Sequence, residues 1–295
     1  TQLAGDDTGS GLLRVLEDPA AVAARIRERE AARGRRYGAA TVRAYYIAVL
    51  ALFKHNPEFR AARPGLFQAY GEVYAAAHAP VEARYDSNAA TRRQRAAFVT
   101  YPEALAAYRR LPRGSADALL LGLYVLMCPK RNDFHGCAAY DADAGEAPPP
   151  DADALGLNYV VLSGAGGALH LNEFKTRKYY GKLVEPLPPE LAAQMRASFA
   201  ARPRSHLFLG RDGRPYASAD SFRAWAAGRF SRIFGGRRVT FNTLRHAFCT
   251  HIAGARLPRA LRRHLAAGMC HSLAMQDQYA FHEFCGGAPA AEASA

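Results

Sequence analysis

Five polar side chains between residues 131 and 279 are suited to one kind of chemistry. In chain order they are Arg131, Lys175, Arg245, His271 and Tyr279. Guanidinium groups bind the non-bridging oxygens of a phosphate and stabilise the charge that gathers in a transition state. A tyrosine oxygen can attack phosphorus and form a covalent link, while lysine and histidine handle the protons. The set predicts phosphodiester chemistry without a metal ion or another cofactor.

Taken singly, these residues also have ordinary structural explanations. Arg131 could be a solvated arginine, and Arg245 could pair with Asp133 or Glu283. Tyr279, near the end of an amphipathic helix, could be a packed aromatic residue. The prediction therefore depends on the set and its order, and on the elements that position it.

One of those elements is a helix that contains the stretch TLRHAFCTHI, residues 243–252. Leu244, Phe248 and Ile252 recur every four residues and predict its buried stripe. Arg245 and His246 are expected beside that stripe.

A small sheet is expected to carry the lysine. The apolar periodicity changes from helical to alternating in three segments, which predict a three-stranded antiparallel sheet: 157–163, 168–174 and 182–188. Lys175 falls in the turn after the second strand. Lys178 and Lys182 are alternatives, because the sequence positions a hairpin lysine only approximately.

The rest of the chain is expected to be mainly helical. A buried helix from Ser115 to about Met127 precedes Arg131, and a capping box at Thr100 begins another helix. Further helices are expected at 20–30, 41–54, 64–77, 188–201 and 218–234, with one or two short ones ending near Tyr279. Residues 81–98 are polar and basic and predict a tether between two domains, 1–97 and 98–295. Residues 141–153 predict a surface insertion that does not pack, and the tail beyond residue 286 is expected to be frayed.

Composition narrows the partners. Arginine and lysine outnumber acidic residues by 39 to 26, which gives a net charge of +13 and predicts a polyanionic partner. A proteome rich in Ala, Arg and Gly would also produce such a charge. Five scattered cysteines suit a reducing compartment, and no segment predicts a membrane span or a signal peptide. The expected location is intracellular, and nuclear if the host is eukaryotic.

The motifs around the five residues resemble those of the tyrosine recombinase (phage integrase) superfamily. The matching stretches are PKRNDF around Arg131, NEFKTRKYYG around Lys175, NTLRHAF around Arg245, AAGMCHS before and including His271, and QDQYAF around Tyr279. In style they are closest to divergent members from eukaryotic mobile elements and large DNA viruses. The resemblance implies a helical, SAM-like core-binding domain over 1–97 and a catalytic domain over 98–295.

The resemblance also implies an activity. Such enzymes clamp duplex DNA, cleave it through a covalent 3′-phosphotyrosine and exchange strands within a tetramer, in DNA recombination and integration. Tyr279 would be the nucleophile and Lys175 the acid that protonates the leaving oxygen. The implied partner is double-stranded DNA, without a cofactor or a membrane.

This chain departs from the family pattern at two supporting positions. Asn242 stands where the family has a histidine, and an amide cannot act as a base. Asp133 stands two residues after Arg131, where bacterial members have a carboxylate at the third. His246 is expected to point elsewhere on its helix. These departures keep two alternatives open: a type IB topoisomerase-like enzyme, and a catalytically impaired, integrase-derived DNA-binding protein.

Overall fold

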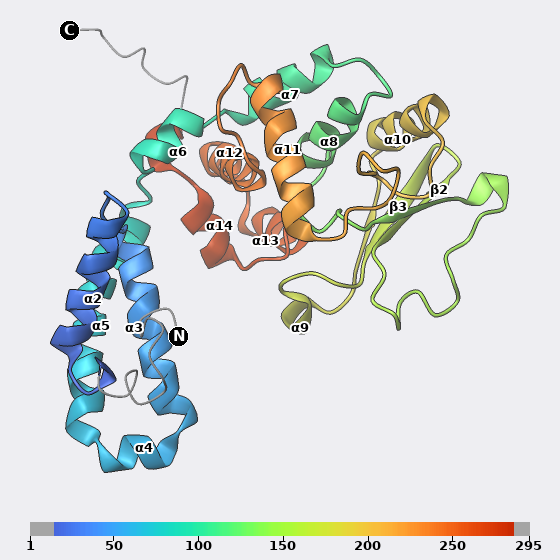
Figure 1. Ribbon diagram of the computed structural model, residues 1–295. Helices are drawn as coiled ribbons and strands as arrows, with labels where there is room; N and C mark the ends of the chain where they lie inside the picture. Colours follow the sequence, from blue (N-terminus) through green and yellow to red (C-terminus); the bar gives the residue numbers. More distant parts are fainter. Residues whose placement is uncertain (1–14, 286–295) are drawn as a thin grey trace, which may run out of the picture. The chain divides into compact units, whose positions relative to one another are not determined.

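The chain forms two compact units that divide after Ser87 (Figure 1). The computed structural model describes residues 15–285, so the expectation for the tail lies outside the described residues. The sequence boundary was expected ten residues later, after residue 97. Between residues 15 and 285, no helix has both the length and the apolar character that crossing a membrane requires.

The first unit is helical, as the sequence predicts. Its helices are α2 (Pro19–Ala32), α3 (Ala39–His55), α4 (Pro57–Ala62) and α5 (Pro64–Ser87). The side chain of Asp18 caps α2 by accepting a hydrogen bond from the Ala20 amide at 2.8 Å. The aromatic residues of α3 and α5 supply the core: Tyr46, Phe53 and Tyr70 are buried together.

The two units divide within the predicted tether, residues 81–98, but most of this segment is helical rather than an irregular linker. Helix α5 continues to Ser87, and α6 (Arg92–Ala97) forms a second helical segment. Thr91 begins α6 with a complete capping box, in which its side chain accepts from the Gln94 amide. The polar composition that suggested a linker marks instead the solvent-facing sides of two helices.

The core of the second unit is built around α8 (Ala116–Val125). Every residue from Ala118 to Val125 is buried. The helices packed against it are α7 (Tyr101–Arg110), α10 (Pro189–Ala201), α11 (Ala219–Ile233) and α12 (Phe241–Gly254). The Ser115 side chain caps α8 by accepting from the Ala118 amide at 3.1 Å. The buried helix predicted here is confirmed.

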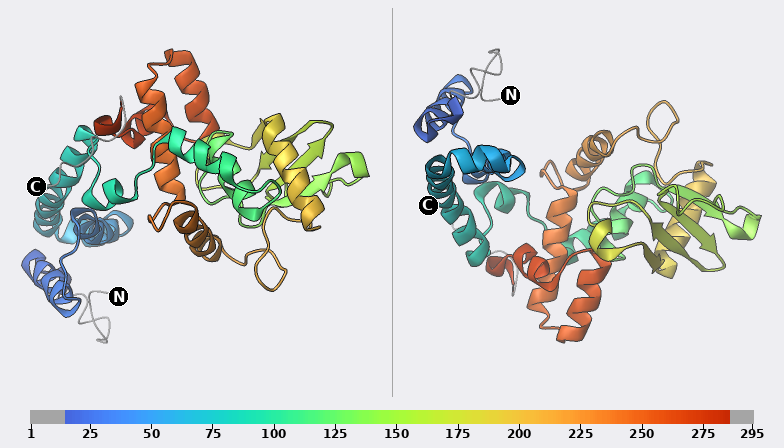
Figure 2. Two further views of the ribbon diagram at one scale, coloured as in Figure 1. Left: turned by 90° about the horizontal axis from the view of Figure 1, so that it is seen from above. Right: turned by 90° about the horizontal axis from the view of Figure 1, so that it is seen from below.

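The sheet has four strands and is mixed, so the predicted three-stranded antiparallel sheet is wrong. The strands lie in the order β1 (Ala138–Asp141), β2 (Tyr159–Ser163), β3 (Gly166–Leu171), β4 (Leu183–Pro186). The predicted strands are β2, β3 and β4, which pair antiparallel. The added strand β1 runs parallel to β2. Figure 2 shows α10 lying across one face of this sheet.

The predicted insertion over 141–153 packs against the rest of the unit. It contains the short helix η1 (Ala142–Ala144). Arg196 of α10 donates to Asp141 at 3.0 Å, and Ala152 is buried. Asp153 accepts from the Tyr159 hydroxyl at 3.2 Å. The acidic residues that suggested a solvated loop are the acceptors that attach it.

Short helices complete the unit and carry the candidate residues at their ends. They are α9 (Arg177–Tyr180), α13 (Arg259–Gly268), α14 (Leu273–Tyr279) and η2 (His282–Phe284). The chain turns sharply between α13 and α14 at Cys270, which adopts a left-handed conformation with φ +54°. This turn places His271 in the interior of the unit, where it is buried.

Candidate active site

Arg245 is the central residue of the site and is fully buried. Its guanidinium group donates to the carbonyl oxygens of Pro129 at 2.6 Å and Met269 at 3.3 Å. Its Nε–H has no partner within the described residues, and no carboxylate pairs with it there. The sequence placed Arg245 beside the buried stripe, whereas it lies inside the core. A buried cation that is satisfied by neutral acceptors alone leaves positive charge available to an anion.

His271 lies against this arginine in its neutral form. Arg245 Nη2 donates to His271 Nδ1 at 3.5 Å, which leaves the ring proton on Nε2. Burial, together with the charges of Arg245 and Arg131, lowers the pKa of His271 to about 3. Nε2 is buried without a partner in the described part of the chain. The site therefore contains a second buried donor that has no acceptor.

Arg131 is held through its backbone. Its carbonyl oxygen accepts from the Tyr124 hydroxyl at 2.5 Å, and its amide donates to Asp133 Oδ2 at 3.2 Å. Burial raises the pKa of Asp133, while the hydrogen bond from the Arg131 amide opposes that rise. Asp133 thus supports Arg131 through the main chain, and the structure gives Arg245 no ion pair with it.

Tyr279 completes a cluster with Arg245 and His271. It is the last residue of α14. Its ring centroid lies 5.2 Å from the guanidinium carbon of Arg245 and 5.6 Å from the His271 ring centroid. The structure thus brings together three of the five residues that the sequence singles out, from three different helices or turns.

His246 contacts this tyrosine, contrary to the expectation that it points elsewhere. Its Nδ1–H donates to the carbonyl oxygen of Tyr279 at 2.7 Å. Its ring stacks on Phe281 at 4.2 Å between centroids and lies 4.7 Å from the Tyr279 ring. Burial lowers the pKa of His246 to about 4, so the ring is neutral at neutral pH. His246 therefore fixes the backbone on both sides of the end of α14.

Lys175 is exposed in the loop between β3 and α9, and no contact within residues 15–285 joins it to the cluster. Its two alternatives are engaged elsewhere: Lys182 pairs with Asp153, and the Lys178 ammonium lies 4.8 Å above the Tyr179 ring. A hydrogen bond of 3.1 Å from Thr176 Oγ1 to the Cys270 carbonyl attaches this loop beside His271.

Asn242 lies in the first turn of α12 and is exposed. Its side chain makes no hydrogen bond within the part of the chain that the structure describes, so it is a surface amide three residues before Arg245.

Sequence reasoning missed Lys130, the neighbour of Arg131. Lys130 is buried and pairs with Glu185 of β4, and its ammonium also donates to the carbonyl oxygen of Gly268 at the end of α13. It therefore links the loop before Arg131 to the sheet and to the helix before His271. A single lysine beside an arginine in PKRNDF carried no signal of this burial.

Replacing Lys130 by methionine should lower the free energy of unfolding by about 2–3 kcal/mol. This loss is smaller than the loss from breaking a fully buried ion pair, because the Glu185 side chain is partly exposed to water. Urea unfolding measures the change. Lys178→Met, at an exposed position, is the control and should change stability by less than about 0.5 kcal/mol. Equal stability of Lys130→Met and the parent protein would contradict this structural role.

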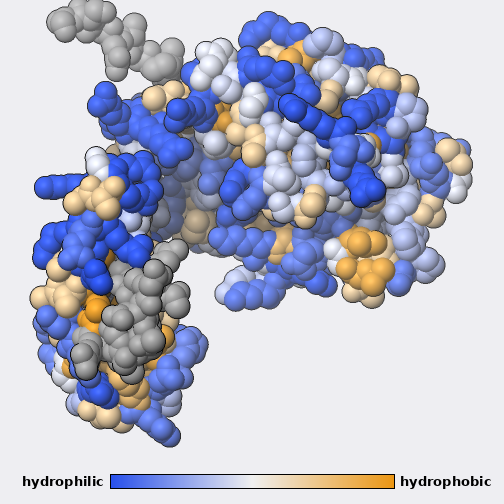
Figure 3. Space-filling model, viewed as in Figure 1, coloured by the Kyte–Doolittle hydropathy of each residue, from blue (hydrophilic) through white to orange (hydrophobic). Residues whose placement is uncertain are grey.

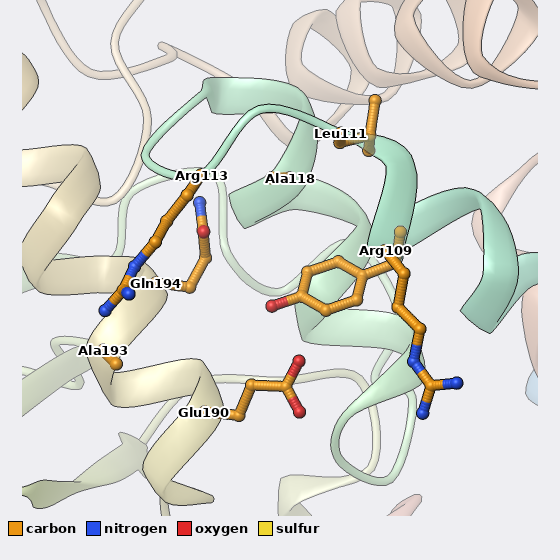
Figure 4. A pocket seen from close by; sticks show the side chains of 8 residues that line it. Arg109, Leu111, Arg113, Ala118, Glu190, Ala193 and Gln194 are labelled. Atoms are coloured by element: carbon orange, nitrogen blue, oxygen red, sulfur yellow. The ribbon is translucent and has the colours of Figure 1, made fainter.

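A pocket of about 320 Å³ lies elsewhere on the second unit, between α7, α10 and the loop that joins α7 to α8 (Figure 4). Glu190, Arg109 and Arg113 are among the residues that line it. None of the candidate residues lines this pocket. The surface in view in Figure 3 is largely hydrophilic, with separate apolar patches.

Residues 15–285 contain no group of three or more His, Cys, Asp or Glu side chains able to hold a metal ion. Comparison of the chain with protein-family models gives no match, and comparison with curated proteins gives none either. The proposal that follows therefore depends on the residues and their geometry.

Proposed function

We propose that the protein is a site-specific DNA recombinase that cleaves and rejoins DNA through a covalent 3′-phosphotyrosine. The observation that carries the proposal is the pair of buried donors, Arg245 Nε and His271 Nε2, which lack acceptors beside the Tyr279 ring. Unsatisfied buried donors are costly and mark sites that a ligand completes. A phosphodiester supplies the negative oxygens that both donors lack.

The proposed reaction follows from the groups in the cluster. The oxygen of Tyr279 attacks phosphorus, its proton passes to solvent water, and the bond from phosphorus to the 5′ oxygen breaks. Arg245 and Arg131 stabilise the charge on the non-bridging oxygens, and His271 Nε2 donates to one of them. Lys175 protonates the departing 5′ oxygen when DNA orders its loop. Attack by a 5′ hydroxyl then reverses these steps, restores a phosphodiester and frees Tyr279.

The proposed function assigns a role to each of the two units. The second unit is mainly helical with a small four-stranded mixed sheet, and the five candidate residues follow one another along it in the order that the superfamily resemblance implies. The first unit is assigned the DNA-holding role of a core-binding domain, and the net charge of +13 of the whole chain suits a protein that binds DNA. Strand exchange would take place in a tetramer assembled on DNA.

Covalent trapping tests the proposal. A duplex with a nick close to the cleavage position loses a short fragment after attack, so that religation fails and the adduct accumulates. Pools of random-sequence duplexes replace the unknown target site. We expect a protein–DNA adduct that resists denaturant. The DNA should be attached to a peptide that contains Tyr279. The absence of any adduct together with salt-sensitive DNA binding would instead favour the DNA-binding protein that Asn242 suggests.

His246→Ala should slow adduct formation about tenfold or more, because the hydrogen bond to the Tyr279 carbonyl and the ring contacts both disappear. The rate of adduct formation in single turnover measures this effect. His246→Asn should recover much of the rate, since its amide can donate to the same carbonyl oxygen. Equal rates for the alanine and asparagine variants would show that His246 does not act through this bond.

A further inference from the structure

Two neighbouring tyrosines project from the loop that follows Lys175. Tyr179 is 74% exposed and Tyr180 is 38% exposed, although large aromatic rings usually bury most of their surface. Both belong to α9, a single helical turn that Gly181 ends with φ +66°. The two exposed tyrosines therefore belong to a regular helical turn, which ends at a glycine in a conformation that favours glycine.

Positive charge surrounds these rings. The ammonium group of Lys178 lies 4.8 Å from the Tyr179 ring centroid, and Lys175 and Arg177 precede it in the same loop. Aromatic rings interleaved with basic side chains are the usual surface for a nucleic acid strand, in which the bases stack and the phosphates meet the cations. Arg177 forms an ion pair with Glu173, and no acidic residue lies between Glu173 and Glu185 in the sequence to oppose Lys175 and Lys178.

The turn is attached directly to the candidate active site. Thr176, at the start of α9, donates to the Cys270 carbonyl, one residue before His271. Tyr179 and Tyr180 follow Thr176 within one helical turn, so this hydrogen bond holds their turn next to Cys270. The two tyrosines therefore lie beside the residues that would surround a cleaved phosphate.

We propose that Tyr179, with Tyr180 behind it, forms a stacking platform for an unpaired DNA base next to the cleavage position. A tyrosine ring needs the face of a base, and a paired, stacked base presents only its edges in the grooves. Strand exchange releases one strand end from the duplex after cleavage, so its bases become available. This inference rests on the proposed function for its biological setting, and on the exposed rings for its chemistry.

The test measures binding without cleavage. The full chain carrying Tyr279→Phe is mixed with a random-sequence duplex that contains a short single-stranded gap with 2-aminopurine, and with the same duplex without the gap. Stacking on Tyr179 should quench the 2-aminopurine fluorescence. Tyr179→Ala should remove the quenching and weaken binding to the gapped duplex about tenfold, while binding to the intact duplex changes less than about twofold.

Two further variants separate the ring from the charge. Tyr179→Phe keeps the ring and should retain both the quenching and the affinity. Lys178→Ala removes a cation and should weaken binding to both duplexes by a similar factor. Equal loss of affinity for both duplexes in Tyr179→Ala, or quenching that survives in it, would overturn the proposal. Because no variant in this experiment can cleave DNA, this result is independent of whether the parent protein forms an adduct.

Discussion

Tyr279→Phe should abolish the covalent adduct with nicked DNA, with a loss of at least about 1,000-fold, while the protein still binds DNA in a salt-sensitive manner. Phenylalanine keeps the ring that lies 5.2 Å from the Arg245 guanidinium and 4.7 Å from the His246 ring. The substitution therefore removes the nucleophilic oxygen and little else. Denaturing electrophoresis of the trapped complex measures the adduct, and titration at two salt concentrations measures binding.

A second tyrosine provides the opposite control. The Tyr101 hydroxyl donates to the Val125 carbonyl at 2.6 Å, so Tyr101→Phe loses a hydrogen bond within the same unit. It should lower the free energy of unfolding by about 1 kcal/mol and leave the adduct yield unchanged. If Tyr279→Phe forms the adduct at the parental rate, Tyr279 is not the nucleophile and another residue must be.

The helical part of this fold was predictable because its signals are local. Ser115 caps α8, Thr100 caps α7, and the apolar period of α12 follows from Leu244 and Phe248. Such signals need only neighbouring residues, and the structure confirms them.

Strand β1 was not predictable in the same way. Its residues, Ala138–Asp141, have weak strand propensity, and it forms by pairing with β2 and by a bond from the Ala139 amide to the Ser205 carbonyl. These partners lie far along the chain. The segment predicted as a tether does contain the division between the two units, but its helices were missed because polarity alone cannot distinguish a linker from the exposed side of a helix.

In the candidate site, the residue types could be predicted from the sequence but their burial could not. Helical periodicity placed Arg245 at the margin of a buried stripe, yet the carbonyl groups of Pro129 and Met269 draw it into the core. Those partners belong to a loop 116 residues earlier and a turn 24 residues later. The contact of His246 with the Tyr279 carbonyl likewise depends on how α12 and α14 pack. The spacing of residues along one helix does not predict contacts with residues of other elements.

Arg245→Met should reduce adduct formation by about 1,000-fold or more while changing the free energy of unfolding by less than about 2 kcal/mol. Losing the guanidinium removes donors to the charge that develops on the phosphate, which accounts for the loss of rate. Two effects on stability oppose each other. The Pro129 and Met269 carbonyl groups lose their donor, at about 1–3 kcal/mol each, but the cost of a buried cation without a carboxylate partner also disappears.

The comparison with Arg229 decides between a functional and a structural arginine. Arg229 pairs with Asp117 at 3.1 Å, so Arg229→Met should lower stability modestly and leave adduct formation intact. Thermal unfolding with added DNA sharpens the distinction, because a ligand that binds the native state raises its stability by mass action. DNA should stabilise Arg229→Met as it does the parent protein, and Arg245→Met much less. If Arg245→Met instead lowers the free energy of unfolding by more than about 4 kcal/mol, Arg245 has a structural role. The buried donors then no longer support a phosphate site.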